Sequence, residues 1–145
     1  FWPKEYNSKR PSLQLRNHPV TKTRGQLEAE ISEAVIKFEK EYMGRGPDET
    51  KSYIIDDMIL VRLKGVLTPA EKQLAKTCDY ADGKALVKQV RIQLLENGRM
   101  LLEKLVLDIT GQKVTSLHTD ISTVTGERVI IFVLAGVPDC CDATD

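Results

Sequence analysis

The sequence predicts an α+β fold, a two-layer sandwich in which an antiparallel four-stranded sheet carries helices on one face, with the element order α-β-β-α-α-β-β. Three observations support this prediction. Residues 26–42 and 82–109 repeat apolar side chains every three or four positions, as amphipathic helices do. Residues 53–63 and 113–134 each contain two strand-like runs separated by turn residues. The length of 145 residues suits one domain.

The first helix is predicted from Gln26 onwards. Its buried stripe is Leu27, Ile31, Ala34, Val35, Phe38 and Tyr42. It is expected to end at Gly44-Arg45-Gly46-Pro47, because glycine can adopt the left-handed cap and proline cannot extend a helix. Arg45 could make this loop an anion site, but phosphate-binding loops usually precede a helix rather than follow one, so a helix cap is the favoured interpretation.

The next segment predicts two strand runs and the start of a second helix. Residues 53–55 and 58–63 flank Asp56-Asp57, which indicates either a hairpin or one long bent strand. Thr68-Pro69-Ala70-Glu71 then combines a capping threonine, a proline suited to the first helical position, and a glutamate that closes a capping box. A short helix is therefore expected to begin at this point.

A long helix is predicted from about Asp82 to Ile109. Its expected buried stripe is Val87, Val90, Leu94, Leu101, Leu105 and Ile109. Gly98 lies on the same stripe, although glycine in a helix interior costs about 1 kcal/mol relative to alanine. Two explanations are open: Gly98 allows another backbone to approach closely, or the helix has a local kink at Asn97-Gly98.

Two strands, residues 113–122 and 128–134, follow Gly111 and are joined near Thr125-Gly126. The second is almost continuously apolar, which predicts a central strand. In the first, a period of two places Val114, Ser116, His118, Asp120 and Ser122 on one face, and Thr115, Leu117, Thr119 and Ile121 on the other. The second group is expected to face the helices.

Among the patterns in the sequence, the strand with His118 and Asp120 most resembles a reactive or ligand-binding site. A histidine near a carboxylate can act as a general base or bind a metal ion. The Cα atoms of His118 and Asp120 would lie about 7 Å apart. No third ligand and no nucleophile motif accompany them. We therefore favour cross-strand or dimer contacts over a ligand site, and a ligand site over catalysis, with no metal and no cofactor. The candidate ligand or interface residues are Ser116, His118, Asp120, Ser122 and Arg45.

Charge is unevenly placed in a chain whose formal net charge is zero. Residues 1–24 form a basic arm or linker, residues 25–135 the predicted domain, and residues 136–145 an acidic tail. The arm holds one acidic residue, Glu5, and the basic residues Lys4, Lys9, Arg10, Arg16, Lys22 and Arg24. Nucleic-acid binding through the arm is one alternative, but a nucleic-acid module should show basic residues between aromatics on a folded face, and this pattern is missing.

Composition indicates the cellular compartment that the protein is expected to occupy. No apolar run approaches the ~20 residues of a membrane-spanning helix, so no membrane insertion is expected. The three cysteines, Cys78, Cys140 and Cys141, have neither zinc-site spacing nor an even count. An odd number without a disulfide framework fits a reducing compartment, which predicts a cytoplasmic protein.

Several ordered blocks together resemble the MpsC-like family. They are residues 25–34, 44–47, 57–71, 118–123 and 125–129, and they extend over nearly the whole predicted domain. The family label implies a link to a sodium-translocating, membrane-potential-generating system, but the resemblance supplies no catalytic residues. It implies an accessory or regulatory subunit that docks to a membrane component or binds a small anion such as bicarbonate.

These observations favour a non-enzymatic accessory or regulatory protein that forms a homodimer, because two-fold pairing is the commonest oligomer. The strand face with Ser116, His118, Asp120 and Ser122 is the expected dimer contact or anion site. The alternative is a small-anion or metabolite sensor, or an enzyme, that uses His118 and Asp120 with Arg45.

Overall fold

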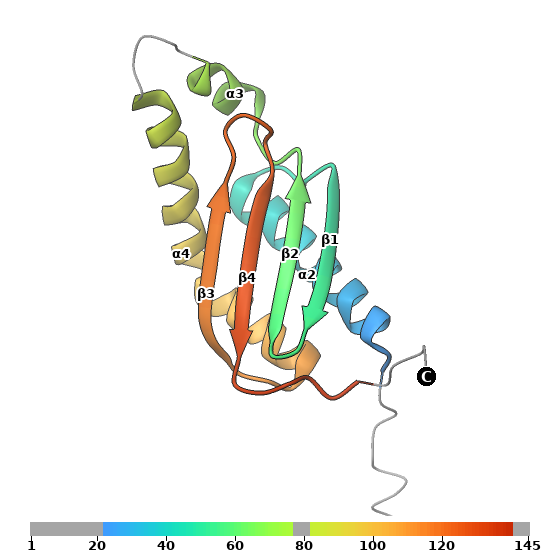
Figure 1. Ribbon diagram of the computed structural model, residues 1–145. Helices are drawn as coiled ribbons and strands as arrows, with labels where there is room; N and C mark the ends of the chain where they lie inside the picture. The colour runs from blue at the N-terminus through green and yellow to red at the C-terminus, as the bar shows by residue number, and fades with distance from the viewer. Residues whose placement is uncertain (1–21, 77–81, 141–145) are drawn as a thin grey trace, which may run out of the picture.

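A four-stranded antiparallel sheet with helices on one face forms the computed structural model, which describes residues 22–76 and 82–140 (Figure 1). The strand order in the sheet is β1-β2-β4-β3. The elements are α2 (Arg24–Met43), β1 (Glu49–Ile55), β2 (Met58–Lys64), α3 (Pro69–Ala75), α4 (Asp82–Thr110), β3 (Val114–Ile121) and β4 (Arg128–Leu134). The predicted fold class and element order are confirmed, and the apolar β4 is a central strand as expected.

Side-chain caps fix where the first two helices begin. Helix α2 starts slightly before the predicted Gln26, because the Thr23 side chain accepts a hydrogen bond from the Gln26 backbone while the Gln26 side chain reaches back to Thr23. It ends at Gly44, whose φ of 80° is left-handed. Helix α3 begins with the predicted capping box of Thr68 and Glu71.

The segment around Asp56-Asp57 is a hairpin rather than a bent strand. Ile55 pairs with Met58, so the two aspartates form a two-residue turn, and Asp56 has a positive φ of 53°. Aspartate tolerates this conformation better than most residues, which explains its place at the turn.

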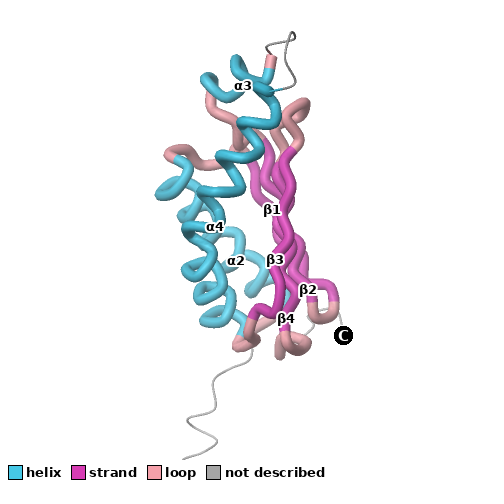
Figure 2. Tube along the Cα trace, turned by 90° about the vertical axis from the view of Figure 1, so that its left-hand side faces the viewer, coloured by secondary structure: helices cyan, strands magenta, loops and turns pink. Residues whose placement is uncertain are grey.

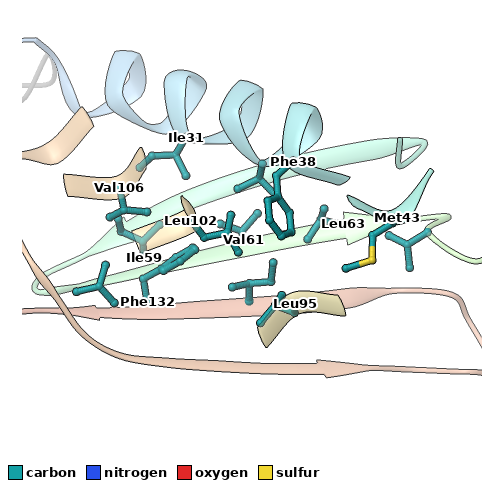
Figure 3. Close-up of a cluster of buried hydrophobic side chains, with 14 of the residues drawn as sticks. Ile31, Phe38, Met43, Ile59, Val61, Leu63, Leu95, Leu102, Val106 and Phe132 are labelled. Carbon is teal, nitrogen blue, oxygen red and sulfur yellow. The ribbon is translucent and has the colours of Figure 1, made fainter. Parts of the chain in front are cut away.

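The core lies between the sheet and the two long helices (Figure 3). Ile59, Val61 and Leu63 on β2 alternate inward, and Ile59 pairs with Phe132 of β4. Ile31 and Phe38 from α2, with Leu95, Leu102 and Val106 from α4, complete the cluster. In Figure 2 the helices all lie on one side of the sheet, and no described element covers the other side. That uncovered side is called the outer face below.

The buried stripe of α4 differs from the predicted one. The residues that face the core are Val87, Arg91, Leu95, Gly98, Leu102 and Val106, whereas Val90 and Leu101 are exposed and Leu94, Leu105 and Ile109 are half-buried. Helix α4 therefore carries two adjacent stripes of mostly apolar residues along its surface. The buried stripe is the one that includes the charged Arg91. The prediction chose the more continuously apolar stripe and so rotated the helix by about one residue.

Gly98 allows a close approach, as one of the two explanations held, but a ring approaches it rather than a backbone. A Cβ built at Gly98 would overlap Phe38 of α2, with the ring's Cζ at 2.6 Å and Tyr42 Cε1 at 3.4 Å. The two rings stack with centroids 4.6 Å apart. Helix α4 continues through Asn97-Gly98 without a break.

The start of β3 departs from the predicted alternation at two residues, because Val114 is buried and Thr115, which was expected to face the helices, is exposed. Val114 is buried and pairs with the inward Leu134, whereas Ser116 pairs with Val133. The register shifts between Val114 and Ser116, leaving Thr115 as the extra residue of a β-bulge. The bulge resets the alternation, so Val114 does not share a face with Ser116.

Candidate functional site: the outer face of the sheet

The outer face displays Ser116, His118 and Asp120 along the edge strand β3. Their cross-strand neighbours on β4 are Val133, Ile131 and Val129. The list of outer-face residues, read across the sheet in rows, is Ile55–Met58–Val133–Ser116, Tyr53–Leu60–Ile131–His118 and Lys51–Arg62–Val129–Asp120. Most of the surface in these three rows is apolar, and their charged side chains all lie in the third row. Glu49 and Lys64 continue the same face one row further along β1 and β2.

Among the described residues, no hydrogen bond joins His118 and Asp120. The His118 Nε2 atom lies 3.2 Å from Ser116 Oγ, while the Asp120 carboxylate accepts from Lys88 Nζ at 3.3 Å across the sheet edge. The backbone N–H of Ile121 lowers the pKa of Asp120, and Lys88 lowers it further. A carboxylate can orient the imidazole of a general base, but the Asp120 carboxylate contacts Lys88 instead.

Ser122 lies outside the row pattern, in the hairpin between β3 and β4. Its backbone N–H donates to Glu127 O, and its Oγ accepts from Thr125 N at 3.2 Å. An open hollow beside this hairpin is lined by both Asp120 and Ser122, together with Lys88 and Glu127, but His118 is not among its lining residues. The structure therefore places Ser122 near Asp120 and away from the His118 row.

Arg45 holds the loop after α2 in place. Its Nη1 donates to the carbonyl oxygens of Gly65 at 2.7 Å and Leu67 at 2.9 Å, and its Nη2 pairs with Asp48 at 3.0 Å. Within residues 22–76 and 82–140, no hydrogen bond or ion pair connects Arg45 with His118. The contacts of Arg45 are those of a residue that stabilises the conformation of this loop.

The apolar centre of the outer face is bordered by charged side chains. Arg62 Nη2 pairs with Glu127 at 2.7 Å, and Lys64 pairs with Glu49 at 3.2 Å. Lys51 is exposed and makes no hydrogen bond or ion pair with the described part of the chain. An apolar centre with a charged border is the usual composition of a protein-binding surface.

A second group of polar side chains, which the sequence analysis did not find, lies on the helix-facing side of the sheet. Two glutamates and two arginines, here called the charge cluster, come from α2, α3, α4 and β4: Glu39, Glu71, Arg91 and Arg128. Arg91 is 2% exposed and binds Glu71 through two nitrogens, at 2.6 and 2.8 Å, while its Nη2 also donates to Val66 O at 2.6 Å. These contacts join four elements at the end of the sheet.

The cluster is less complete around Glu39. This side chain is fully buried, with Arg91 Nη1 at 3.4 Å and Arg128 Nη1 at 3.5 Å. Burial raises the pKa of Glu39, although the two arginines oppose that effect. Burial likewise lowers the pKa of Arg128. Glu39 Oε1 and Arg128 Nη1 form no hydrogen bond, so each depends on the charge of the other.

A signal for this cluster is present in the sequence. Arg91 lies four residues after Val87 and four before Leu95, and Glu39 follows Val35 by four. Arg128 keeps the period of two that places the alternate residues of β4 inward. Charged residues in phase with a buried stripe indicate buried ion pairs, but their partners become clear only from the packing of the helices.

The charge cluster predicts an acid-sensitive contribution to stability. Burial would raise the pKa of Glu71, but hydrogen bonds from Arg91 and Thr68 outweigh it and lower that pKa below its ordinary value of 4.5. The contribution of Glu71 is therefore complete above about pH 4.5 and is lost as pH falls through the lower folded-state value. In urea denaturation from pH 7 to pH 3, we expect Glu71→Gln to be less stable at pH 7 and its deficit to shrink below pH 4.5. A deficit that stays constant with pH would contradict this assignment.

The described residues meet the requirements neither of a metal-binding group nor of a membrane-spanning helix. No three histidine, cysteine, aspartate or glutamate side chains of residues 22–76 and 82–140 gather into a group that could hold a metal ion. No helix in these ranges combines the length and apolar character needed to cross a bilayer. Cys140 packs against the edge of the core, while Cys78, Cys141, most of the predicted basic arm and the end of the acidic tail lie outside the described residues.

Comparison with known proteins places the chain in a family. The chain is similar to the Bacillus subtilis (strain 168) protein named "Uncharacterized protein YbcI", with 47% identity over 115 residues that cover 79% of this chain and 90% of that protein. It is also similar to "Uncharacterized protein YrhF" of the same organism, with 26% identity over 106 residues, 72% of this chain and 84% of that protein. No solved structure matches. Residues 23–136 match the family described as "Na+-translocating membrane potential-generating system (MpsC)", and the chain belongs to this family.

Proposed function

We propose that this protein is a non-enzymatic accessory or regulatory protein that acts by binding protein through the outer face, and that its first partner is a second copy of itself. The observation that carries this proposal is the apolar surface on β1, β2 and β4, which no described element covers. Tyr53 and Ile55 on this face are 39% and 45% exposed. Contiguous apolar surface of this kind marks interaction sites in folded proteins.

The geometry favours a contact surface over a chemical site. His118 and Asp120 are engaged separately, by Ser116 and by Lys88. The hollow beside the β3–β4 hairpin is lined by one cationic side chain, Lys88, and by the two carboxylates of Asp120 and Glu127, a balance that disfavours an anion such as bicarbonate. A sheet with one bare apolar face is instead half of a β-sandwich, whose second half another sheet can supply.

The family description supports the wider setting of this proposal. A family described by a sodium-translocating, membrane-potential-generating system suits a cytoplasmic accessory component of such an ion or bicarbonate system. The translocating activity itself would belong to a membrane partner, because ion translocation requires segments that span the bilayer.

The association is tested by placing a charge at the centre of the outer face. We expect Ile131→Lys to raise the dimer dissociation constant at least tenfold in sedimentation equilibrium, because a lysine there would be desolvated in the contact. Val124→Lys is the control, since Val124 is 84% exposed outside the outer-face rows and should leave the constant unchanged. A wild-type protein that stays monomeric, or an association that Ile131→Lys does not weaken, would overturn the proposal.

The non-enzymatic part of the proposal is tested by a thermal-shift screen with bicarbonate, phosphate, sodium, divalent metals and nucleotides. A ligand at about 100 times its dissociation constant stabilises a protein by roughly 2.7 kcal/mol, which such a screen detects. We expect no shift from any of them. A ligand-specific shift that is lost in His118→Ala would instead establish the small-anion or metabolite sensor.

A further inference from the structure

The arrangement of charges on the outer face specifies how two copies would pair. Building on the proposed homodimer, we infer that the two sheets pack face to face about a two-fold axis that runs parallel to the strands, between β2 and β4. This arrangement sets Lys51 of each protomer opposite the partner's Asp120. It assigns Asp120 to partner recognition rather than to chemistry.

The pairing follows from the strand order and register. A two-fold axis parallel to the strands keeps each residue in its own row and exchanges the two sides of the sheet, so β1 lies over the partner's β3 and β2 over its β4. In the middle row, Leu60 then meets the partner's Ile131, and Tyr53 meets the partner's His118. Apolar side chains therefore contact apolar ones, and the imidazole gains an aromatic neighbour.

The third row provides the charge complementarity. Its ends are Lys51 on one edge strand and Asp120 on the other, and the two-fold axis brings each against its opposite twice per dimer. Lys51 makes no ion pair within the described residues. The Asp120 side chain is 81% exposed despite its contact with Lys88, so it can accept from a second cation. The pairs lie at the edges, where charged residues border an interface without being fully desolvated.

The other in-plane axis gives a poor match. A two-fold axis perpendicular to the strands, centred on the middle row, keeps each strand over itself and exchanges the first and third rows. Lys51 would then face the partner's Ile55 and Asp120 the partner's Ser116, so neither would meet an opposite charge. The charge of Lys51 would lie against an apolar side chain with no ion-pair partner among the described residues, which is costly. The self-complementary axis is the one that runs along the strands.

The dimensions of the face suit this occupant. Four strands of about seven residues form a surface roughly 19 Å wide and 24 Å long, the size of one layer of a β-sandwich. Two such layers pack about 10 Å apart, with strands within about 30° of parallel or antiparallel. The helices of both copies would remain on the outside, so no steric conflict arises from α2 or α4 (Figure 2).

A charge exchange in the full-length protein tests the arrangement. Lys51→Asp and Asp120→Lys each place like charges opposite one another twice per dimer, and each should raise the dissociation constant roughly tenfold in about 50 mM salt. The double variant Lys51→Asp with Asp120→Lys restores opposite charges and should return the constant to within about threefold of wild type. Lys84→Glu, an exposed lysine on α4, is the control and should leave it unchanged.

The outcomes separate this inference from the proposed function. Rescue by the double variant supports the axis along the strands, because a merely structural effect of either substitution would accumulate instead of cancelling. If Ile131→Lys breaks the dimer but the charge exchange gives no rescue, the outer face is the contact and the inferred axis is wrong. If neither Ile131→Lys nor the charge-exchange variants change the dissociation constant, or if wild type is monomeric, both the inferred axis and the proposed function are wrong.

Discussion

Replacement of Arg91 by methionine is expected to destabilise the protein by about 3–5 kcal/mol, the cost of leaving a partner of a buried ion pair alone. Arg91 is almost fully buried and supplies two hydrogen bonds to Glu71, one to Val66 O, and one of the two positive charges next to Glu39. Methionine keeps much of the volume, so the loss reports the charge and the hydrogen bonds rather than a cavity.

Urea denaturation at pH 7 measures this effect, and the same helix provides a matched control. Arg99 is a half-buried arginine of α4 that pairs with Glu96 and Glu103 along the helix surface, at 3.4 and 3.5 Å. Arg99→Met should change the free energy of unfolding by less than about 0.5 kcal/mol, because such helix-surface pairs contribute little.

A conservative variant keeps this prediction testable if Arg91→Met does not fold. Arg91→Lys retains the charge but loses the two-nitrogen contact with Glu71, so an intermediate loss is expected. Equal stability of Arg91→Met and wild type would mean that the four charges are not coupled through Arg91. The cluster would then not be what joins α2, α3, α4 and β4.

The same cluster explains where the sequence was a sufficient guide and where it was not. Periodicity and capping residues located α2, α3, α4 and the four strands, because these signals act within a few neighbouring residues. The burial phase of α4 was wrong because hydrophobicity alone ranks Val90 above Arg91. The buried Arg91 is stabilised by Glu39 and Glu71, which come from other helices. No pattern in the sequence around Arg91 predicts those partners.

The candidate site shows the same division. A period of two correctly placed Ser116, His118 and Asp120 on the face away from the helices. Val114 was misplaced because the bulge depends on pairing with β4 rather than on the local sequence. The contact from Lys88 to Asp120 crosses from α4 to the edge of the sheet, a distance that strand periodicity does not describe. Lys51 was not singled out, since its row partners became visible only with the register of all four strands.

The packing of α2 against α4 depends on a residue that has no side chain. Gly98→Ala is expected to lower the free energy of unfolding by about 1–3 kcal/mol, the usual cost of overpacking a well-packed core. In an exposed helix interior the same change would stabilise by about 1 kcal/mol, because alanine is the better helix former. The sign is reversed here because the new methyl group would overlap the Phe38 ring, whose movement is restricted by its stacking on Tyr42.

Two further variants separate the steric effect from helix propensity. Asn97→Ala, at the neighbouring exposed position, changes propensity without entering the contact and should stabilise slightly. Phe38→Leu removes the ring, so adding Gly98→Ala in that background should cost less than in wild type, and the difference between the two costs measures the coupling. Thermal unfolding of the four variants decides the matter: a higher melting temperature for Gly98→Ala alone would show that the ring yields to the methyl group. Glycine at position 98 would then be unnecessary for bringing α2 and α4 together.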